Sequence, residues 1–256
     1  MIEVTFQNES VLLISSSTVY GSGYLDHAEA EIRDFMGDAR RVLFIPYALY
    51  NRQAYTKLAR ERFRRMGYDL ESAHEYSDPR QAVSDAEAVF AGGGNTFRLL
   101  KALYDFDLLP AIRQRASKGI RYIGSSAGSN VACPTIKTTK DMPIVQPPSF
   151  DAIGLVPFQI SPHYLDPDPN STHMGETQEE RILQFLEENA TPVVGLREGA
   201  MIRVQAGAVV LKGVSGARIF SRGHDPVEME SGSKWAFIMG TATLHAKEPP
   251  PWPTSK

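Results

Sequence analysis

The sequence is short of cysteine, of long apolar runs and of net charge. Cys133 is the only cysteine among 256 residues, so the chain can form neither a disulfide framework nor a multi-cysteine zinc site, which is typical of a reducing compartment. No apolar run approaches the ~18 residues of a membrane helix, and the opening MIEVTFQNES lacks the basic-then-apolar order of a signal peptide. We therefore expect a cytoplasmic protein without a membrane partner.

The charges of the chain nearly balance. There are 27 Lys and Arg residues against 30 Asp and Glu residues, which gives a formal net charge of -3. Such a balance attracts a polyanion weakly and argues against a nucleic-acid partner. Hydrophobic residues make up 42% of the chain, a share typical of a globular protein. This length allows one or two domains, and a single α/β domain often reaches about 250 residues.

Short apolar runs alternate with longer amphipathic segments through the first three quarters of the chain. The runs have the length of buried strands and end in turn residues, whereas the segments carry apolar residues at helical spacing. Strands joined by helices form right-handed crossovers in a mostly parallel sheet, so we expect an α/β fold with helices flanking the sheet. The expected strands are 11–14, 42–45, 88–91 and 122–124, and the expected helices are 26–36, 52–66, 96–104 and 108–117.

The chain after Ser149 is rich in proline and predicts extended segments and loops. A helix is expected over residues 177–189, because Thr177 and Glu180 fit a capping box. Short runs around glycines then predict antiparallel strands that close the sheet, at 201–204, 208–211, 218–220 and 235–239.

We expect a single α/β domain over residues 1–246. The last residues, 247–256, contain four prolines and predict a loose tail.

Residues 124–128 match the pattern Gly-x-Ser-x-Gly directly after an expected strand. In that pattern small flanking residues allow a sharp turn, and the central hydroxyl projects from the carboxyl end of the strand. The helix that follows offers free N–H groups to an oxyanion. Ser126 is therefore the candidate nucleophile, and Ala127 is a candidate oxyanion donor. A purely structural turn, or Ser125 as the nucleophile, are the alternatives.

Gly92, Gly93 and Gly94 follow another expected strand and precede a helix. Consecutive glycines let backbone N–H groups approach a ligand closely. Neither a dinucleotide fingerprint nor a P-loop fits, since Phe97 stands where the next glycine would be and no Gly-Lys-Ser/Thr follows. Beside a serine turn, Gly93 or Gly94 is suited to supply the second oxyanion donor, although a plain tight turn is the alternative.

A serine nucleophile needs a base, and a histidine base needs an acid. Among six histidines, His163 lies in a rigid loop between Pro162 and Tyr164, downstream of the serine turn. The candidate acids are Asp141, which would give the order Ser, Asp, His, and Glu198, which would give Ser, His, Glu. His173 with nearby aspartates has no usual metal-ligand spacing, so we expect no metal.

Several separated blocks together resemble peptidase E, the α-aspartyl dipeptidase family of serine peptidases. The resemblance runs from about residue 11 to residue 220. It implies hydrolysis of dipeptides with an N-terminal aspartate, without a cofactor, on a flavodoxin-like fold related to class I glutamine amidotransferases. The expected partner is then a small dipeptide, with the chain acting as a monomer or a homodimer. The blocks are residues 90–97, 122–128, 138–145, 160–164 and 195–199.

Carried over residue by residue, the resemblance implies Ser126 as nucleophile and His163 as base. It assigns the acid that orients His163 to Asp141 or Glu198, and we favour Glu198 because it follows a strand-like run over 193–196.

Gln178 stands where the resemblance predicts an arginine. If that arginine binds the aspartyl carboxylate, the cation here comes from Arg181, His173 or Lys140. Glu176 is a candidate for binding the substrate's α-amino group.

Two other functions remain as alternatives. A cyanophycinase-like enzyme shares the serine turn but acts on β-linked aspartyl-arginine, and acidic groups near the pocket would favour it. An amidotransferase-like module that binds a small ligand would keep the fold without catalysis. A cysteine mechanism through Cys133 fits less well, since this residue lies seven positions past Ser126 and precedes Pro134.

Overall fold

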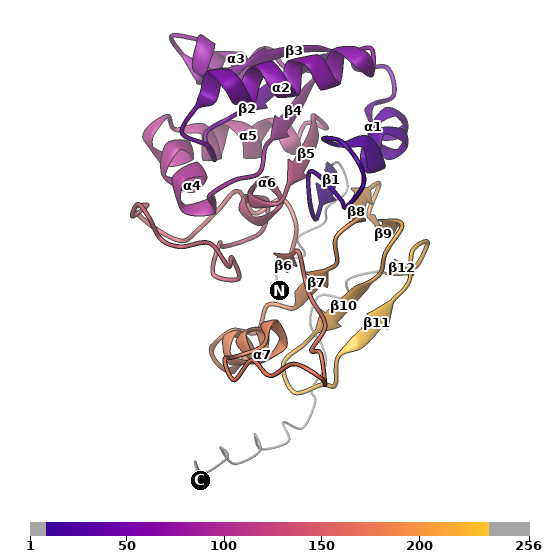
Figure 1. Cartoon of the computed structure of the whole chain (residues 1–256). Helices are drawn as coiled ribbons and strands as arrows, with labels where there is room; N and C mark the ends of the chain where they lie inside the picture. Colours follow the sequence, from indigo (N-terminus) through magenta and orange to yellow (C-terminus); the bar gives the residue numbers. More distant parts are fainter. Residues whose placement is uncertain (1–8, 236–256) are drawn as a thin grey trace.

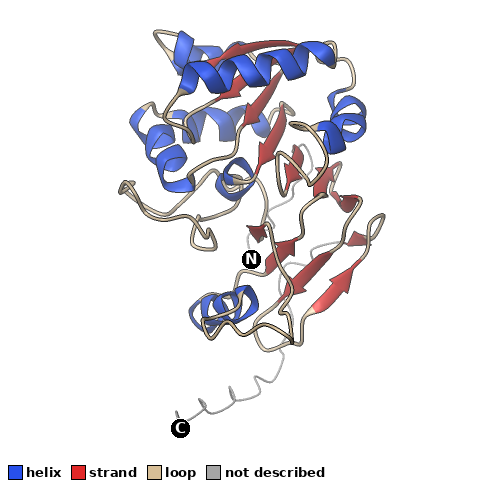
Figure 2. Ribbon diagram, in the orientation of Figure 1, coloured by secondary structure: helices blue, strands red, loops and turns tan. Residues whose placement is uncertain are grey.

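The computed structural model describes residues 9–235, which form two sheets and their covering helices (Figures 1 and 2). The expected tail 247–256 lies outside the described residues. So do most of the expected strand 235–239 and the last part of the expected domain 1–246.

The larger sheet contains eight strands. They are β1 (Ser10–Ile14), β2 (Arg41–Ile45), β3 (Asp69–Ser72), β4 (Ala88–Ala91), β5 (Arg121–Ser125), β8 (Ala200–Gln205), β9 (Ala208–Gly213) and β12 (Lys234–Trp235). Their order is β12-β9-β8-β1-β5-β4-β2-β3. The five from β1 to β3 in this order pair in parallel, and β8, β9 and β12 continue the sheet with antiparallel pairing. The predicted α/β fold, with a mostly parallel sheet and antiparallel strands toward the C-terminus, is confirmed.

Helices cover both faces of this sheet (Figure 2). They are α1 (Glu29–Met36), α2 (Arg52–Arg65), α3 (Pro79–Asp85), α4 (Thr96–Asp105), α5 (Leu108–Ala116) and α6 (Ala127–Val131), with 3₁₀ turns η1 (Asp26–Ala28) and η2 (Ala73–Glu75). Alternate residues of a strand point to opposite faces. Accordingly Leu12 and Ile14 pack in the apolar cluster of α1 and α2, and Val11 and Leu13 pack with α3 to α6.

Four further strands form a second, smaller sheet in the order β11-β10-β7-β6. They are β6 (Gln159–Pro162), β7 (Val193–Leu196), β10 (Ala217–Phe220) and β11 (Val227–Met229), and α7 (Gln178–Glu188) packs nearby. The expectation that the run 218–220 closes the first sheet is wrong, because β10 pairs with β7 instead. The predicted capping box at Thr177 is present at the start of α7.

Two elements of the larger sheet region escape the sequence patterns. Strand β3 alternates exposed acidic with buried residues and has only four residues, and α3 has seven residues and begins at a proline. Both are too short for a clear periodicity. Their position is decided by pairing with β2 and by packing against α5.

Candidate active site

Ser126 lies in a sharp turn between β5 and α6. Its backbone has φ 51 and ψ -109, a conformation that costs a non-glycine residue about 1–3 kcal/mol. The turn is held by close backbone contacts, since a Cβ on Gly128 would lie 2.0 Å from the carbonyl oxygen of Ala91, and one on Gly124 would lie 2.5 Å from the carbonyl oxygen of Gly128. The two glycines of the motif are therefore required by space.

His163 follows the last residue of β6 and faces this serine. Its Nε2 lies 2.9 Å from Ser126 Oγ, and its Nδ1 lies 2.8 Å from Glu198 Oε1. A carboxylate only accepts hydrogen bonds, so Nδ1 carries the proton toward Glu198 and Nε2 accepts from the serine hydroxyl. The structure thus brings together three residues from three separate loops, in the order hydroxyl, imidazole and carboxylate.

The backbone of His163 is also strained and is held from β1. Its φ is 53, and its N–H donates to Ser15 Oγ at 2.9 Å. The Ser15 hydroxyl in turn donates to the carbonyl oxygen of Leu196 at 2.8 Å, so it joins the ends of β1, β6 and β7. Sequence reasoning missed Ser15, although its place directly after an expected strand was a usable signal.

Asp141 lies at the start of α4 rather than beside the histidine. Its carboxylate accepts hydrogen bonds from the Thr96 backbone N–H at 2.7 Å and from Thr96 Oγ1 at 2.6 Å. A carboxylate at a helix N-terminus is stabilised by the helix dipole. The partner of His163 Nδ1 is Glu198, whereas Asp141 anchors its own loop to the start of α4.

The glycine loop approaches Ser126 closely. A Cβ on Gly93 would lie 3.2 Å from Ser126 Cβ and 3.8 Å from its Oγ, so Gly93 lies against the serine. Gly94 has φ 133, which side-chain-bearing residues rarely adopt. Ala127 is the first residue of α6, where a backbone N–H has no partner within the helix. Gly93 and Ala127 therefore lie next to the serine, whereas Gly94 packs against the backbone of Ala48.

Lys140 and Gln178 lie on the other side of the histidine. Lys140 Nζ donates to the carbonyl oxygen of His163 at 2.8 Å and to Gln178 Oε1 at 3.1 Å. The same Gln178 oxygen accepts from the N–H of Leu165 at 3.1 Å. Partial burial lowers the pKa of Lys140 to about 8. The glutamine thus links the first turn of α7 to the histidine loop and to a lysine.

The other predicted substrate-binding residues lie in α7 and in the loop that precedes it. Arg181 Nε lies 3.6 Å from Glu176 Oε2, and Glu176 Oε1 accepts a hydrogen bond from Gln184 at 2.8 Å. His173 is exposed on the loop before α7.

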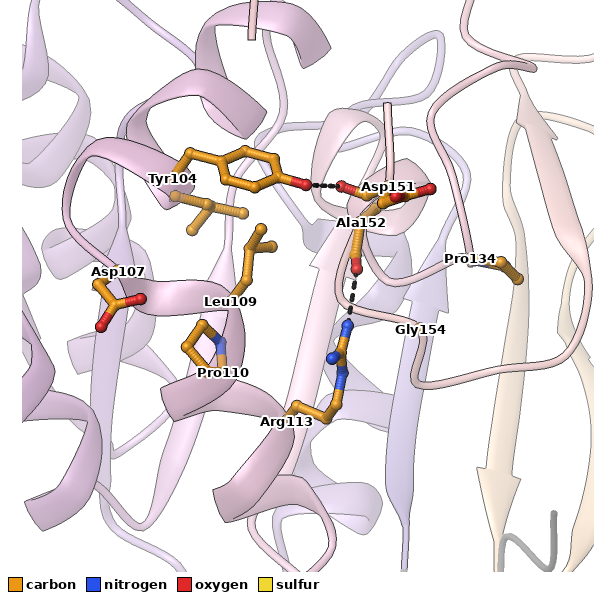
Figure 3. Close-up of a pocket in the computed structure, with 10 residues that line it drawn as sticks. Tyr104, Asp107, Leu109, Pro110, Arg113, Pro134, Asp151, Ala152 and Gly154 are labelled. Atoms are coloured by element: carbon orange, nitrogen blue, oxygen red, sulfur yellow. Dashed lines mark hydrogen bonds between the residues drawn. The ribbon is translucent and has the colours of Figure 1, made fainter. Parts of the chain in front are cut away.

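A cavity of about 580 Å³ lies elsewhere, beside α4 and α5 (Figure 3). Two of its polar side chains are engaged with the main chain, since the Tyr104 hydroxyl donates to the carbonyl oxygen of Asp151 and Arg113 donates to that of Ala152. It includes none of the residues around Ser126. Within residues 9–235, no three His, Cys, Asp or Glu side chains gather as metal ligands, and no helix is long and apolar enough to cross a membrane.

A strained serine after a parallel strand, an imidazole at 2.9 Å and a carboxylate beyond it are the features that define the serine hydrolase class on an α/β fold. The model of peptidase family S51 matches residues 11–212. The chain belongs to this family and is a peptidase.

Relatives cover most of the chain. It is 51% identical to "Peptidase E" of Streptomyces coelicolor over 224 residues, which is 88% of this chain and 92% of the relative. It is 44% identical to the "Probable alpha-aspartyl dipeptidase" of Drosophila melanogaster over 233 residues, which is 90% of this chain and 97% of the relative.

Solved structures share the fold. A peptidase from an acI-B1 Actinobacterium matches with a TM-score of 0.68 at 17% identity, covering 91% of this chain and 98% of that one. A putative peptidase E protein from Listeria monocytogenes matches with a TM-score of 0.62 at 23% identity, covering 81% of this chain and 99% of that one.

Proposed function

We propose that this peptidase is a serine dipeptidase that hydrolyses peptides with an N-terminal aspartate. The observation that carries the proposal is the continuous chain of hydrogen bonds from Ser126 Oγ through His163 to Glu198, with distances of 2.9 and 2.8 Å. The printed names of the relatives, "Peptidase E" and "Probable alpha-aspartyl dipeptidase", support the substrate class.

In this mechanism Ser126 Oγ attacks the scissile carbonyl carbon while His163 Nε2 takes its proton. The imidazole then gives that proton to the departing amine, and an acyl-enzyme on Ser126 remains until water, activated by the same histidine, hydrolyses it. Glu198 holds the imidazole orientation and stabilises its charge. The N–H groups of Ala127 and of Gly93 or Gly94 bind the oxyanion, and each donor contributes about 3–4 kcal/mol.

The substrate groups outside the scissile bond need partners of opposite charge, because a buried unpaired charge is costly. We assign the α-amino group to Glu176, and we place Gln178, Arg181 and His173 around the side chain of the N-terminal residue.

The remaining expectations extend the proposal. A single domain is supported by β6 and β7, whose inner residues share one apolar cluster with the larger sheet. A cytoplasmic location is supported by the single thiol, which is buried.

Two alternatives are less well supported. A cyanophycinase-like enzyme would need acidic groups for an arginine-containing substrate, whereas the small cavity beside the histidine loop is lined by basic side chains and no carboxylate. A non-catalytic binding module would not need the strained backbone that both Ser126 and His163 adopt.

The test is the replacement Ser126→Ala with Ser125→Ala as a matched control. Ser125 is adjacent in the chain, but its side chain is fully buried. We expect Ser126→Ala to abolish hydrolysis of Asp-Leu and covalent labelling by a serine-directed phosphonate, with little change in the melting temperature. Ser125→Ala should retain both. Hydrolysis by Ser126→Ala, or labelling that persists in it, would refute the assignment.

A further inference from the structure

A small cavity adjoins the histidine loop, between residues 137–140 and α7. Its volume is about 80 Å³, which leaves room for a few waters or a small polar group. Three basic side chains line it, those of Lys137, Lys140 and Arg181, and no carboxylate does. A concave site of one charge sign concentrates ligands of the opposite sign. The cavity is therefore suited to an anion.

Of these three cations, Arg181 alone has a carboxylate within ion-pair distance in the described part of the chain. Arg181 has the Glu176 carboxylate 3.6 Å away, and Lys137 donates to the side-chain oxygen of Asn189 at 3.4 Å. The hydrogen bonds of Lys140 go to neutral oxygens, on His163 and on Gln178.

The environment of Lys140 also leaves its charge incompletely compensated. Partial burial lowers its pKa to about 8, even though the negative charges of Asp141 and Glu198 act to raise it, and the positive charge of Arg181 lowers it further. A carboxylate bound to this ammonium would replace the hydration that burial removed.

We propose that Lys140, oriented by Gln178, binds the side-chain carboxylate of the substrate's N-terminal aspartate. The inference rests on the proposed function and names the residue that determines its specificity. Gln178 occupies the position where the resemblance to peptidase E predicts arginine, and its side-chain oxygen accepts a hydrogen bond from Lys140 Nζ at 3.1 Å. The positive charge at this site thus comes from Lys140, in the loop beside α7, and not from position 178 of α7. Because Lys140 also donates to the carbonyl oxygen of His163, the bound carboxylate lies beside the residue that activates Ser126.

The experiment compares Lys140→Gln with the wild type on three substrates: Asp-Leu, its neutral isostere Asn-Leu, and Asp-Leu amide, which lacks the terminal carboxylate. We expect kcat/KM for Asp-Leu and Asp-Leu amide to fall about 30-fold, the size expected for a lost hydrogen bond to a charged group. Asn-Leu should lose only the contribution of the Lys140 hydrogen bond to the His163 carbonyl oxygen, so the ratio of kcat/KM for Asp-Leu to that for Asn-Leu should fall at least about tenfold. If Lys140 has only a structural role, kcat/KM should fall alike for all three substrates, and that result would overturn the proposal.

Lys137→Gln is the matched control, because it removes the same charge from the same segment. Lys137 also lines the cavity, but its ammonium donates to Asn189 and not to Gln178, so we expect the ratio of kcat/KM for Asp-Leu to that for Asn-Leu to be nearly that of the wild type. A fall of this ratio equal to that of Lys140→Gln would show that general electrostatics, and not Lys140, selects the acid.

The exchange Lys140→Gln/Gln178→Lys moves the cation across the 3.1 Å hydrogen bond, and we expect it to restore at least part of the preference for Asp-Leu over Asn-Leu. If Lys140→Gln lowers kcat/KM for Asp-Leu and Asn-Leu but not for Asp-Leu amide, the cavity binds the terminal carboxylate and the proposal is wrong. Failure of the proposed function looks different, since the wild type would then hydrolyse no dipeptide and Ser126 would remain unlabelled.

Discussion

The two sheets hold their shares of the active site by different means. The central strands of the larger sheet, β1, β2, β4 and β5, are buried on both faces, and residues 11–14 of β1 have no exposed surface. In the smaller sheet β10 is partly buried and β11 is mostly exposed, and the two strands are joined by ion pairs such as Arg218 with Glu228. The proposed nucleophile, Ser126, follows β5 of the first sheet, and the proposed base and acid, His163 and Glu198, lie in loops that follow strands of the second.

The two sheets thus position their residues differently, Ser126 by steric contacts and His163 by hydrogen bonds. Ser126 is fixed by close backbone contacts around Gly124 and Gly128, which leave it little freedom. His163 is instead fixed by hydrogen bonds that its N–H and Nδ1 donate and that its carbonyl oxygen and Nε2 accept. We therefore expect substitutions near the serine to affect stability first, and substitutions near the histidine to affect catalysis first.

The largest expected effect is on the smaller sheet's side, at Glu198. Glu198→Gln should lower kcat/KM about 10²- to 10⁴-fold, because a neutral amide neither fixes the proton on His163 Nδ1 nor stabilises the imidazolium. The melting temperature should hardly change. Asp141→Asn is the comparison, and we expect it to lower kcat/KM less than about tenfold while costing about 1 kcal/mol of stability at the start of α4. The reverse ranking of the two variants, in steady-state kinetics, would assign the acid to Asp141.

On the larger sheet's side, Gly128→Ala tests the steric contacts. A Cβ placed 2.0 Å from the carbonyl oxygen of Ala91 forces the turn apart, and we expect a loss of about 3 kcal/mol in the free energy of unfolding. Activity should fall with it. Gly207→Ala, at φ 75 with nothing within 4 Å of the added atom, should cost only about 1 kcal/mol. Equal denaturation midpoints for the two variants would contradict steric positioning.

Ser15→Ala tests the bond between the two sheets. It leaves the partly buried N–H of His163 without its acceptor, so we expect a loss of about 1–2 kcal/mol in unfolding free energy and a several-fold fall in kcat with little change in KM. Ser129→Ala is the control, since its buried hydroxyl also donates to a main-chain oxygen, that of Ile14, without contacting His163. A fall in kcat that is the same in both variants would mean that Ser15 has no specific role in positioning the base.

The smallest expected effect concerns pH and the Lys140 ammonium. With its pKa lowered to about 8, the side chain loses its proton as the pH rises through that value, and the attraction for an aspartyl carboxylate is lost with it. Between about pH 7 and pH 8.5, the ratio of kcat/KM for Asp-Leu to that for Asn-Leu should fall about fourfold. Effects on the α-amino group and on His163 cancel in this ratio. Lys140→Gln should give a flat ratio, and a flat ratio in the wild type would exclude Lys140 as the titrating group.

Much of the larger sheet could be predicted from the sequence. Strand β4 has the expected bounds, and α2 begins at the expected residue and ends one residue early, because long apolar periodicities and turn residues are local signals. The serine turn was predictable for the same reason, since its glycines and its serine lie within five positions. Strand β3 and the separate second sheet were not, because strand pairing depends on partners far away in the chain.

The sequence by itself determined the local features of this protein: the strained serine turn, the glycine loop, the capping box of α7 and the helix–strand alternation. Each is signalled by residues a few positions apart, although the contact of Gly128 with Ala91 that holds the serine turn comes from the fold. The tertiary structure alone decided that Glu198 faces His163, that Ser15 holds it, and that Lys140 meets Gln178. These contacts join residues 35, 148 and 38 positions apart. No periodicity spans such separations, and only the packing of the two sheets brings the partners within hydrogen-bond distance.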